Sequence, residues 1–155
     1  MYEVGNKSLK PDANKICSVI DAWASSTEQA AVRRADQLLR NLTNNYELGD
    51  KEMKQSTSMA FTSVIKALYK SSKKGAAMQA QGIIYSSESV YRFSPNLMSY
   101  SLVLAAWAQS GEKRSGHMAE ALLKEINELH SLGHRNIKLN TSFLAILLMI
   151  RYLVI

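Results

Sequence analysis

Apolar side chains recur along this chain at the spacing of a helix that buries one face. Three segments place them at positions i, i+3, i+4 and i+7, starting at Ile16, Phe61 and Tyr100. On a helix with 3.6 residues per turn this spacing forms one stripe, whereas a half-buried strand would show alternation. Each segment is followed by a second amphipathic one, at 35–42, 80–87 and 119–126. The pattern therefore predicts an all-α protein made of pairs of amphipathic helices.

The helix pairs are copies of one another. The stretch "SVIDAWAS" at 18–25 resembles "LVLAAWAQ" at 102–109, 84 residues further on. The stretch "ADQLLRNL" at 35–42 resembles "AEALLKEI" at 119–126, again 84 residues further on. A weaker middle copy follows the first by 45 residues. Two segments that keep one offset indicate an internal repeat, and periods of this length are typical of helical solenoids.

The offsets divide the chain into repeat units. We expect one domain over 1–155, an α-solenoid of stacked helix-turn-helix units, with repeats at about 13–57, 58–96 and 97–140 and a partial repeat at 141–155. A single helix pair cannot bury its apolar faces alone, so the units must stack. Neither end carries the polar cap of a finished array, which predicts a segment of a longer one.

Turn and cap residues agree with these units. The stretch "STEQ" at 26–29 has the form of a capping box and is predicted to start the second helix of the first unit. Gly75 and Gly111 fall in the corresponding turns of the other two units. Gly49 and Gly133 lie where second helices should end, as left-handed caps.

Composition narrows the class of protein. With 155 residues, 46% of them hydrophobic and 21% charged, the chain has the make-up of one ordinary folded domain. Cys17 is the only cysteine, which excludes an internal disulfide framework. The formal net charge of +6 suits a polyanionic partner as well as plain solubility. The longest apolar run, 143–155, is broken by Arg151 and is shorter than the roughly 20 residues of a membrane span, so we expect no membrane partner.

Two stretches resemble a known family of helical repeats. "KPDANKICSVIDAWASS" at 10–26 and "SPNLMSYSLVLAAWAQSG" at 94–111 are similar to the opening of pentatricopeptide repeats. "RRADQLLRNL" and "MAEALLKEI" resemble the second helix of the same family. The unit spacings of 45 and 39 residues exceed the usual length of about 35 in that family. The resemblance implies binding of single-stranded RNA, about one base per repeat, in support of RNA processing, stability or translation in a mitochondrion or plastid.

The resemblance also assigns roles to particular residues. The base-contacting residues early in each first helix would be Cys17, Thr62 and Ser101. Those at the ends of units would be Asp12, Thr57, Asn96 and Asn140. Asn14, Met59 and Met98 would flank the bases, and Lys15 and Lys66 would contact phosphates. Thr or Ser paired with Asn favours adenine in this family, so the second and third units are expected to read two adjacent adenines. Cys17 with Thr57 fits no familiar pair.

Other interpretations of these residues stay open. Asp12 and Asn96 precede helices and also suit helix N-caps, while Thr62 and Ser101 also suit a plain helix surface. The two tryptophans complete the apolar stripes and are predicted to be core residues. "KSSKK" at 70–74 reads as a solvated turn. The alternative for the whole chain is a tetratricopeptide-like scaffold that binds proteins, although Trp23 and Trp107 lack the Leu-Gly and Tyr that should follow in that repeat.

Nothing in the sequence predicts an enzyme. The three histidines lack partners at zinc-ligand spacing, and no glycine-rich phosphate loop is present. We therefore expect no catalytic residues, no metal site, no cofactor and no small-molecule substrate. The expected partner is single-stranded RNA, with other proteins as the second possibility.

Overall fold

The computed structural model describes residues 13–28, 30–45, 51–138 and 140–154. Within these ranges the chain forms eight helices and no strand, which confirms the all-α class. The helices are α1 (Ala13–Ser25), α2 (Ala31–Asn45), α3 (Lys51–Ser71), α4 (Ala76–Tyr85), α5 (Ser87–Val90), α6 (Leu97–Ser110), α7 (Ser115–Ser131) and α8 (Thr141–Val154). None of the described helices is both long enough and apolar enough to cross a membrane.

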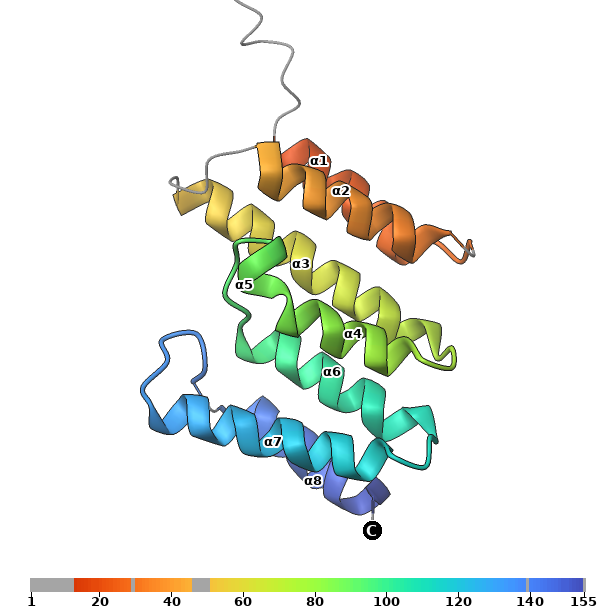
Figure 1. Ribbon diagram of the computed structural model, residues 1–155, viewed down its shortest axis with the longest axis vertical. Helices are drawn as coiled ribbons and strands as arrows, with labels where there is room; N and C mark the ends of the chain where they lie inside the picture. Colours follow the sequence, from red (N-terminus) through yellow and green to blue (C-terminus); the bar gives the residue numbers. More distant parts are fainter. Residues whose placement is uncertain (1–12, 29, 46–50, 139, 155) are drawn as a thin grey trace, which may run out of the picture.

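The helices stack along the long axis of the molecule in chain order (Figure 1). α1 packs against α2 and α3, α3 packs against α4 and α6, and α6 packs against α7 and α8. The helices predicted to open each unit, α1, α3, α6 and α8, are therefore successive neighbours. α2 and α4 each pack against their own first helix and against the next one.

The predicted apolar stripes form the core in the second and third units. Phe61, Val64 and Ile65 on α3 have no exposed surface, and Leu104 and Trp107 on α6 are at most 1% exposed. The stripe of α1 is only partly covered: Ile20 is buried, Trp23 is half-buried and Val19 is 47% exposed. Among the described helices α1 packs mainly against α2 and α3, and part of its apolar face meets solvent.

A partly buried polar network that the apolar pattern did not indicate joins α4, α6 and α7. The indole Nε1 of Trp107 donates to Oε1 of Gln81 at 2.7 Å, which confirms Trp107 as a core residue. Gln81 is 4% exposed, and its Nε2 donates to the Tyr85 hydroxyl at 2.7 Å. That hydroxyl donates in turn to Oε2 of Glu125 at 3.1 Å. Tyr85 is 59% exposed, and the partial desolvation of its hydroxyl raises its pKa above the ordinary value, so it remains a donor.

Three glycines adopt the positive φ that their predicted positions require. Gly75 and Gly111 have φ values of 81° and 64° in the turns between paired helices, as predicted. Gly133 has a φ of 72°, and its amide donates to the carbonyl of His130 at 3.0 Å. The amide of His134 donates to the carbonyl of Leu129 at 3.1 Å, which completes a Schellman cap on α7. Gly49 lies outside the described residues.

Two predicted helix starts are wrong. α2 begins at Ala31, not directly after Ser26, because the Ser26 hydroxyl accepts from the amide of Glu28 at 3.2 Å in a local turn. α3 begins at Lys51 and runs across the predicted unit boundary at 57–58. Proline precedes the first helix in the first and third units, and the second unit has no proline there. Without that stop α3 extends toward its N-terminus and takes in Thr57.

Candidate nucleic-acid interface

Polar contacts hold consecutive first helices side by side in a regular register. The Ser56 hydroxyl on α3 donates to Oδ1 of Asn14 on α1 at 2.6 Å. One to two turns further along α3, the Ser63 hydroxyl donates to Oδ1 of Asp21 at 2.9 Å. Both pairs are 42 residues apart in the chain, so α1 and α3 run alongside each other without a change of register.

The predicted base-flanking residues lie on the solvent-facing side of these helices. Met59 on α3 is 64% exposed and Met98 on α6 is 57% exposed. Asn14 on α1 is exposed, and its Oδ1 accepts from the Ser56 hydroxyl. Exposing an apolar methionine side chain to water is unfavourable, and its polarisable thioether can pack against a partner.

A hydrogen-bond network connects two predicted base-contacting residues across the α3–α6 junction. The Thr62 hydroxyl, half-buried on α3, lies 3.3 Å from the Ser99 hydroxyl on α6 and donates to the carbonyl of Ser58 at 2.9 Å. Oγ of Ser99 also lies 3.1 Å from Oδ1 of Asn96, so the single Ser99 proton is donated either to Asn96 or to Thr62. Nδ2 of Asn96 lies 3.4 Å from the Ser58 hydroxyl, which accepts from it and closes the ring. Thr62 and Asn96 are thus linked through the fully buried Ser99.

Two of the predicted unit-end residues are helix N-caps. Oδ1 of Asn96 accepts from the amide of Ser99 at 3.0 Å at the start of α6. Oδ1 of Asn140 accepts from the amide of Phe143 at 2.9 Å at the start of α8. The N-cap interpretation of Asn96 is therefore confirmed. The cap uses only the Oδ1 atoms, and one Nδ2 hydrogen of Asn96 goes to Ser58. Asp12 lies outside the described residues.

Three other predicted base-contacting residues are less accessible. Ser101 is 4% exposed, and its hydroxyl donates to the carbonyl of Leu97 at 2.7 Å. Thr57 lies inside α3 with no exposed surface, and its hydroxyl has no hydrogen-bond partner in the described structure. Cys17 is half-buried, with its Sγ 3.3 Å from the carbonyl of Ser56. In this arrangement Ser101 and Thr57 do not reach solvent, so contact with a base would require α3 and α6 to move.

The predicted phosphate-contacting residues, Lys15 on α1 and Lys66 on α3, are both exposed. Neither takes part in an ion pair among the described residues. Asp21 is the acidic residue of α1, and its Oδ1 accepts from Ser63. The first-helix surface therefore carries separate cations and few neutralising carboxylates.

The sequence did not indicate a polar cavity of about 470 Å³ beside Asn96. It is lined by Lys54 from α3, by Arg92 and Ser94 from the segment after α5, and by Asn136 from the segment after α7. Nδ2 of Asn136 lies 3.5 Å from the carbonyl of Ser94. These residues belong to no shared motif, and only folding brings the two cations next to Asn96. Lys54 and Arg92 supply the charge that a phosphate oxygen needs.

The described residues contain no group of three or more His, Cys, Asp or Glu side chains placed to hold a metal ion. Comparisons with protein-family models, with curated proteins and with solved structures found no match to this chain.

Proposed function

We propose that this chain is an α-solenoid of pentatricopeptide type, and that it binds single-stranded RNA along the exposed side of α1, α3 and α6. Equivalent positions on neighbouring first helices would meet successive nucleotides, which is how a helical repeat reads a linear polymer. The regular register of α1 against α3, fixed by the Ser56–Asn14 and Ser63–Asp21 bonds, supports this arrangement.

The observation that carries the proposal is the linked pair Thr62 and Asn96. These two residues come from different helices, and the resemblance assigns them to one base. Ser99 links their side chains within hydrogen-bond distance. Asn96 uses Oδ1 for the helix cap and one Nδ2 hydrogen for the Ser58 hydroxyl, which leaves the second Nδ2 hydrogen to donate to a base edge.

Stacking and charge complete the proposed site. A base that bonds to Thr62 and Asn96 would lie between Met59 and Met98, both more than half exposed. Lys66 on α3, together with Lys54 and Arg92 around the cavity beside Asn96, would neutralise neighbouring phosphates. Release of counterions from those phosphates makes the affinity fall as salt rises.

The test is a titration of the folded chain into fluorescently labelled oligo(A), oligo(C) and duplex DNA at two salt concentrations. We expect the tightest binding to oligo(A), and weaker binding at higher salt. The decisive variant is Asn96→Asp, because Asp caps a helix as well as Asn but lacks the Nδ2 donor. Asn127→Asp makes the same change of charge on the exposed surface of α7 and serves as the control.

We expect Asn96→Asp to reduce the preference for oligo(A) over oligo(C), and Asn127→Asp to leave it unchanged. Thermal melts by circular dichroism should show both variants folded. A folded wild-type chain that binds none of the three nucleic acids rejects the proposal and favours the protein-binding scaffold. Equal binding to oligo(A) and oligo(C) rejects the role given to Thr62 and Asn96.

A further inference from the structure

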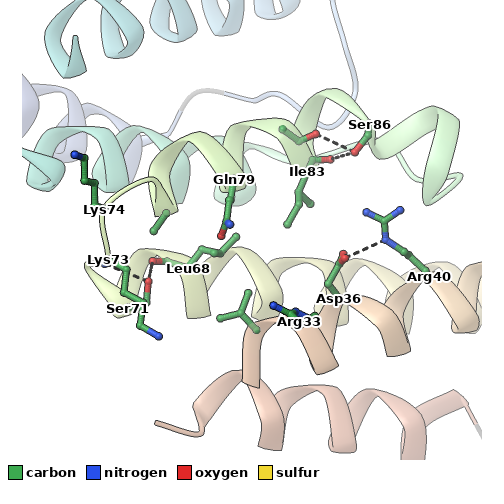
Figure 2. Close-up of a pocket in the computed structure, with 13 residues that line it drawn as sticks. Arg33, Asp36, Arg40, Leu68, Ser71, Lys73, Lys74, Gln79, Ile83 and Ser86 are labelled. Carbon is green, nitrogen blue, oxygen red and sulfur yellow. Dashed lines mark hydrogen bonds and ion pairs between the residues drawn. The ribbon is translucent and has the colours of Figure 1, made fainter. Parts of the chain in front are cut away.

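A second cavity, of about 510 Å³, lies between the second helices α2 and α4, over the C-terminal part of α3 (Figure 2). Leu68 on α3 is part of its lining. Leu68 follows Met59 by nine residues, which is two and a half turns of an α-helix, so the two side chains lie on opposite sides of α3. The α2–α4 cavity is therefore separate from the proposed RNA surface.

The lining of the α2–α4 cavity is strongly basic. Its cations are Arg33 and Arg40 from α2 and Lys73 and Lys74 from the turn between α3 and α4. Asp36 is its one acidic residue, and its carboxylate is already engaged. Oδ2 of Asp36 accepts from Nε of Arg40 at 3.0 Å, and Oδ1 accepts from the Tyr91 hydroxyl. Among the described residues Arg33, Lys73 and Lys74 form no ion pair, so three positive charges are left uncompensated.

Local contacts hold the Arg40 side chain and shape the turn that carries the two lysines. The guanidinium of Arg40 lies 5.1 Å from the centre of the Tyr91 ring, in addition to its ion pair with Asp36. Ser72 has a φ of 47° and Gly75 a φ of 81°, so the turn carrying the lysines contains two left-handed residues. That conformation is unfavourable for serine by about 1–2 kcal/mol. The bond from the Ser71 hydroxyl to the carbonyl of Leu68, at 2.8 Å, holds the start of this turn.

The charges surround an apolar floor. Val32, Leu68 and Ile83 come from α2, α3 and α4, and Figure 2 shows Leu68 and Ile83 directed between the helices. Gly82 faces the same space, and a Cβ at this position would meet no atom within 4 Å. A volume of about 510 Å³ with an apolar floor and a few polar groups is typical of small-molecule sites.

We propose that the α2–α4 cavity binds a small molecule bearing two or more linked phosphate groups. Arg33, near the middle of the cavity in Figure 2, and Lys73, at the end formed by the α3–α4 turn, would bind the phosphates, and Lys74 would add charge at the rim. A bound polynucleotide would need a row of cations that continues beyond the cavity. α4 carries no charged residue along its whole length, so the positive charge ends there and favours a compact ligand.

This inference does not depend on RNA binding at the first helices. Lys73 and Lys74 belong to the stretch that the sequence alone indicated as a solvated turn. Arg33 and Arg40 come from a helix more than 30 residues earlier in the chain. Folding brings the two basic segments to one cavity.

The test is calorimetric titration of the whole chain with ATP and with inorganic tripolyphosphate, in buffer without divalent cations. We expect wild type to bind, and the double variant Arg33→Ala/Lys73→Ala to bind at least about tenfold more weakly, because charge-assisted contacts are lost. The matched control is Arg34→Ala/Lys70→Ala, which removes two exposed cations adjacent to the first pair and outside the cavity lining. We expect the control to stay within about twofold of wild type.

A third variant tests the cavity itself. Gly82→Leu fills the space beside Ile83 and keeps every charge, so it should abolish binding while its thermal melt shows a folded chain. If ATP binds more tightly than tripolyphosphate, the apolar floor contacts the organic part of the ligand. Equal affinities assign the site to the phosphates alone, and both results support the proposal.

Three outcomes of the ATP and tripolyphosphate titrations overturn it. The first is a wild-type chain that binds neither probe, and the second is an equal loss of affinity in both double variants. The third is Gly82→Leu that binds as wild type does. The same variants titrated with oligo(A) separate the two proposals. If Arg33→Ala/Lys73→Ala weakens oligo(A) binding as much as it weakens ATP binding, a polynucleotide occupies this cavity. That result would reject the small-molecule ligand.

Discussion

Replacing Thr57 by valine should stabilise this protein. Thr57 lies inside α3 with no exposed surface, and its hydroxyl has no hydrogen-bond partner in the described structure. A buried hydroxyl without a partner costs about 1–3 kcal/mol of desolvation. Valine has nearly the same shape and the same helix propensity, so Thr57→Val removes that cost without creating a cavity. We expect the free energy of unfolding to rise by about 1 kcal/mol, and the melting temperature of a chain this long by about 2–4 °C.

Thr43 offers a matched control on α2. It is equally buried, but its hydroxyl donates to the carbonyl of Arg40 at 3.0 Å. Thr43→Val loses that bond and should lower the free energy of unfolding by about 0.5–1.5 kcal/mol. Opposite signs for the two substitutions, measured by urea denaturation under one set of conditions, would show that the difference lies in the hydrogen bond and not in the residue type.

The same variant addresses the role of Thr57 in RNA binding. A side chain buried inside α3 does not contact RNA, so Thr57→Val should bind labelled oligo(A) as tightly as wild type. If Thr57→Val destabilises the chain as much as Thr43→Val does, the hydroxyl is bonded in solution and our reasoning about its burial is wrong. If stability rises but oligo(A) binding weakens, Thr57 becomes accessible in the complex, as the resemblance to pentatricopeptide repeats implies.

Three further predictions follow from the backbone and from the buried tyrosines. Gly82→Ala should raise the free energy of unfolding, measured by urea denaturation, by about 0.5–1 kcal/mol. A Cβ there meets nothing within 4 Å, and glycine is a poor helix former. A decrease would show that the site is not an ordinary helix interior. Gly133→Ala should lower it by about 1–2 kcal/mol, because the φ of 72° that closes α7 is unfavourable for alanine; an unchanged value would mean that the cap rearranges at little cost. Burial is the main cause that raises the pKa of Tyr91 above its ordinary value of 10.0, and the hydrogen bond to Asp36 is the second. The unfolded state then loses this proton first, so stability is fully present below about pH 10 and falls above it, by up to about 1.4 kcal/mol per pH unit. Tyr91→Phe should reduce this slope above about pH 10, with Tyr152→Phe on the surface as the control, and an unchanged slope would contradict the assignment.

The apolar pattern predicted the helices and most of the core because burial in a helix repeats every 3.6 residues. Phe61, Leu104 and Trp107 were placed correctly for that reason. Gly75, Gly111 and Gly133 were predictable because left-handed backbone strongly favours glycine. The predicted α3 was too short. Proline precedes the first helix of the first and third units, and the second unit has no proline to mark where its first helix begins. These features depend on local residue chemistry, which a sequence displays directly.

Features that depend on the number of neighbours were not predictable. Ser101 lies outside the apolar stripe of α6 and was expected at a surface. α6 contacts α3, α4, α7 and α8, so it is enclosed on more than one face. Small side chains, among them Ala105 and Ala106, allow these close approaches, and Ser101 is buried with them. Gln81 was missed for the same reason: its burial depends on Trp107, which is 26 residues away in the chain.

The two proposed sites are best regarded as independent surfaces of one helix. Met59 and Lys66 lie on one side of α3, and Leu68 faces the α2–α4 cavity on the other, with the fully buried Val64 and Ile65 packed between α3 and its neighbours. Substitutions at separate sites with no shared partners have nearly additive effects. Loss of Arg33 and Lys73 should therefore leave the preference for oligo(A) intact, and Asn96→Asp should leave ATP binding intact. A double variant combining the two sets that departs from additivity would show that α3 couples the sites. Its rigid packing between α1 and α6 makes a shift of that helix the physical route for such coupling.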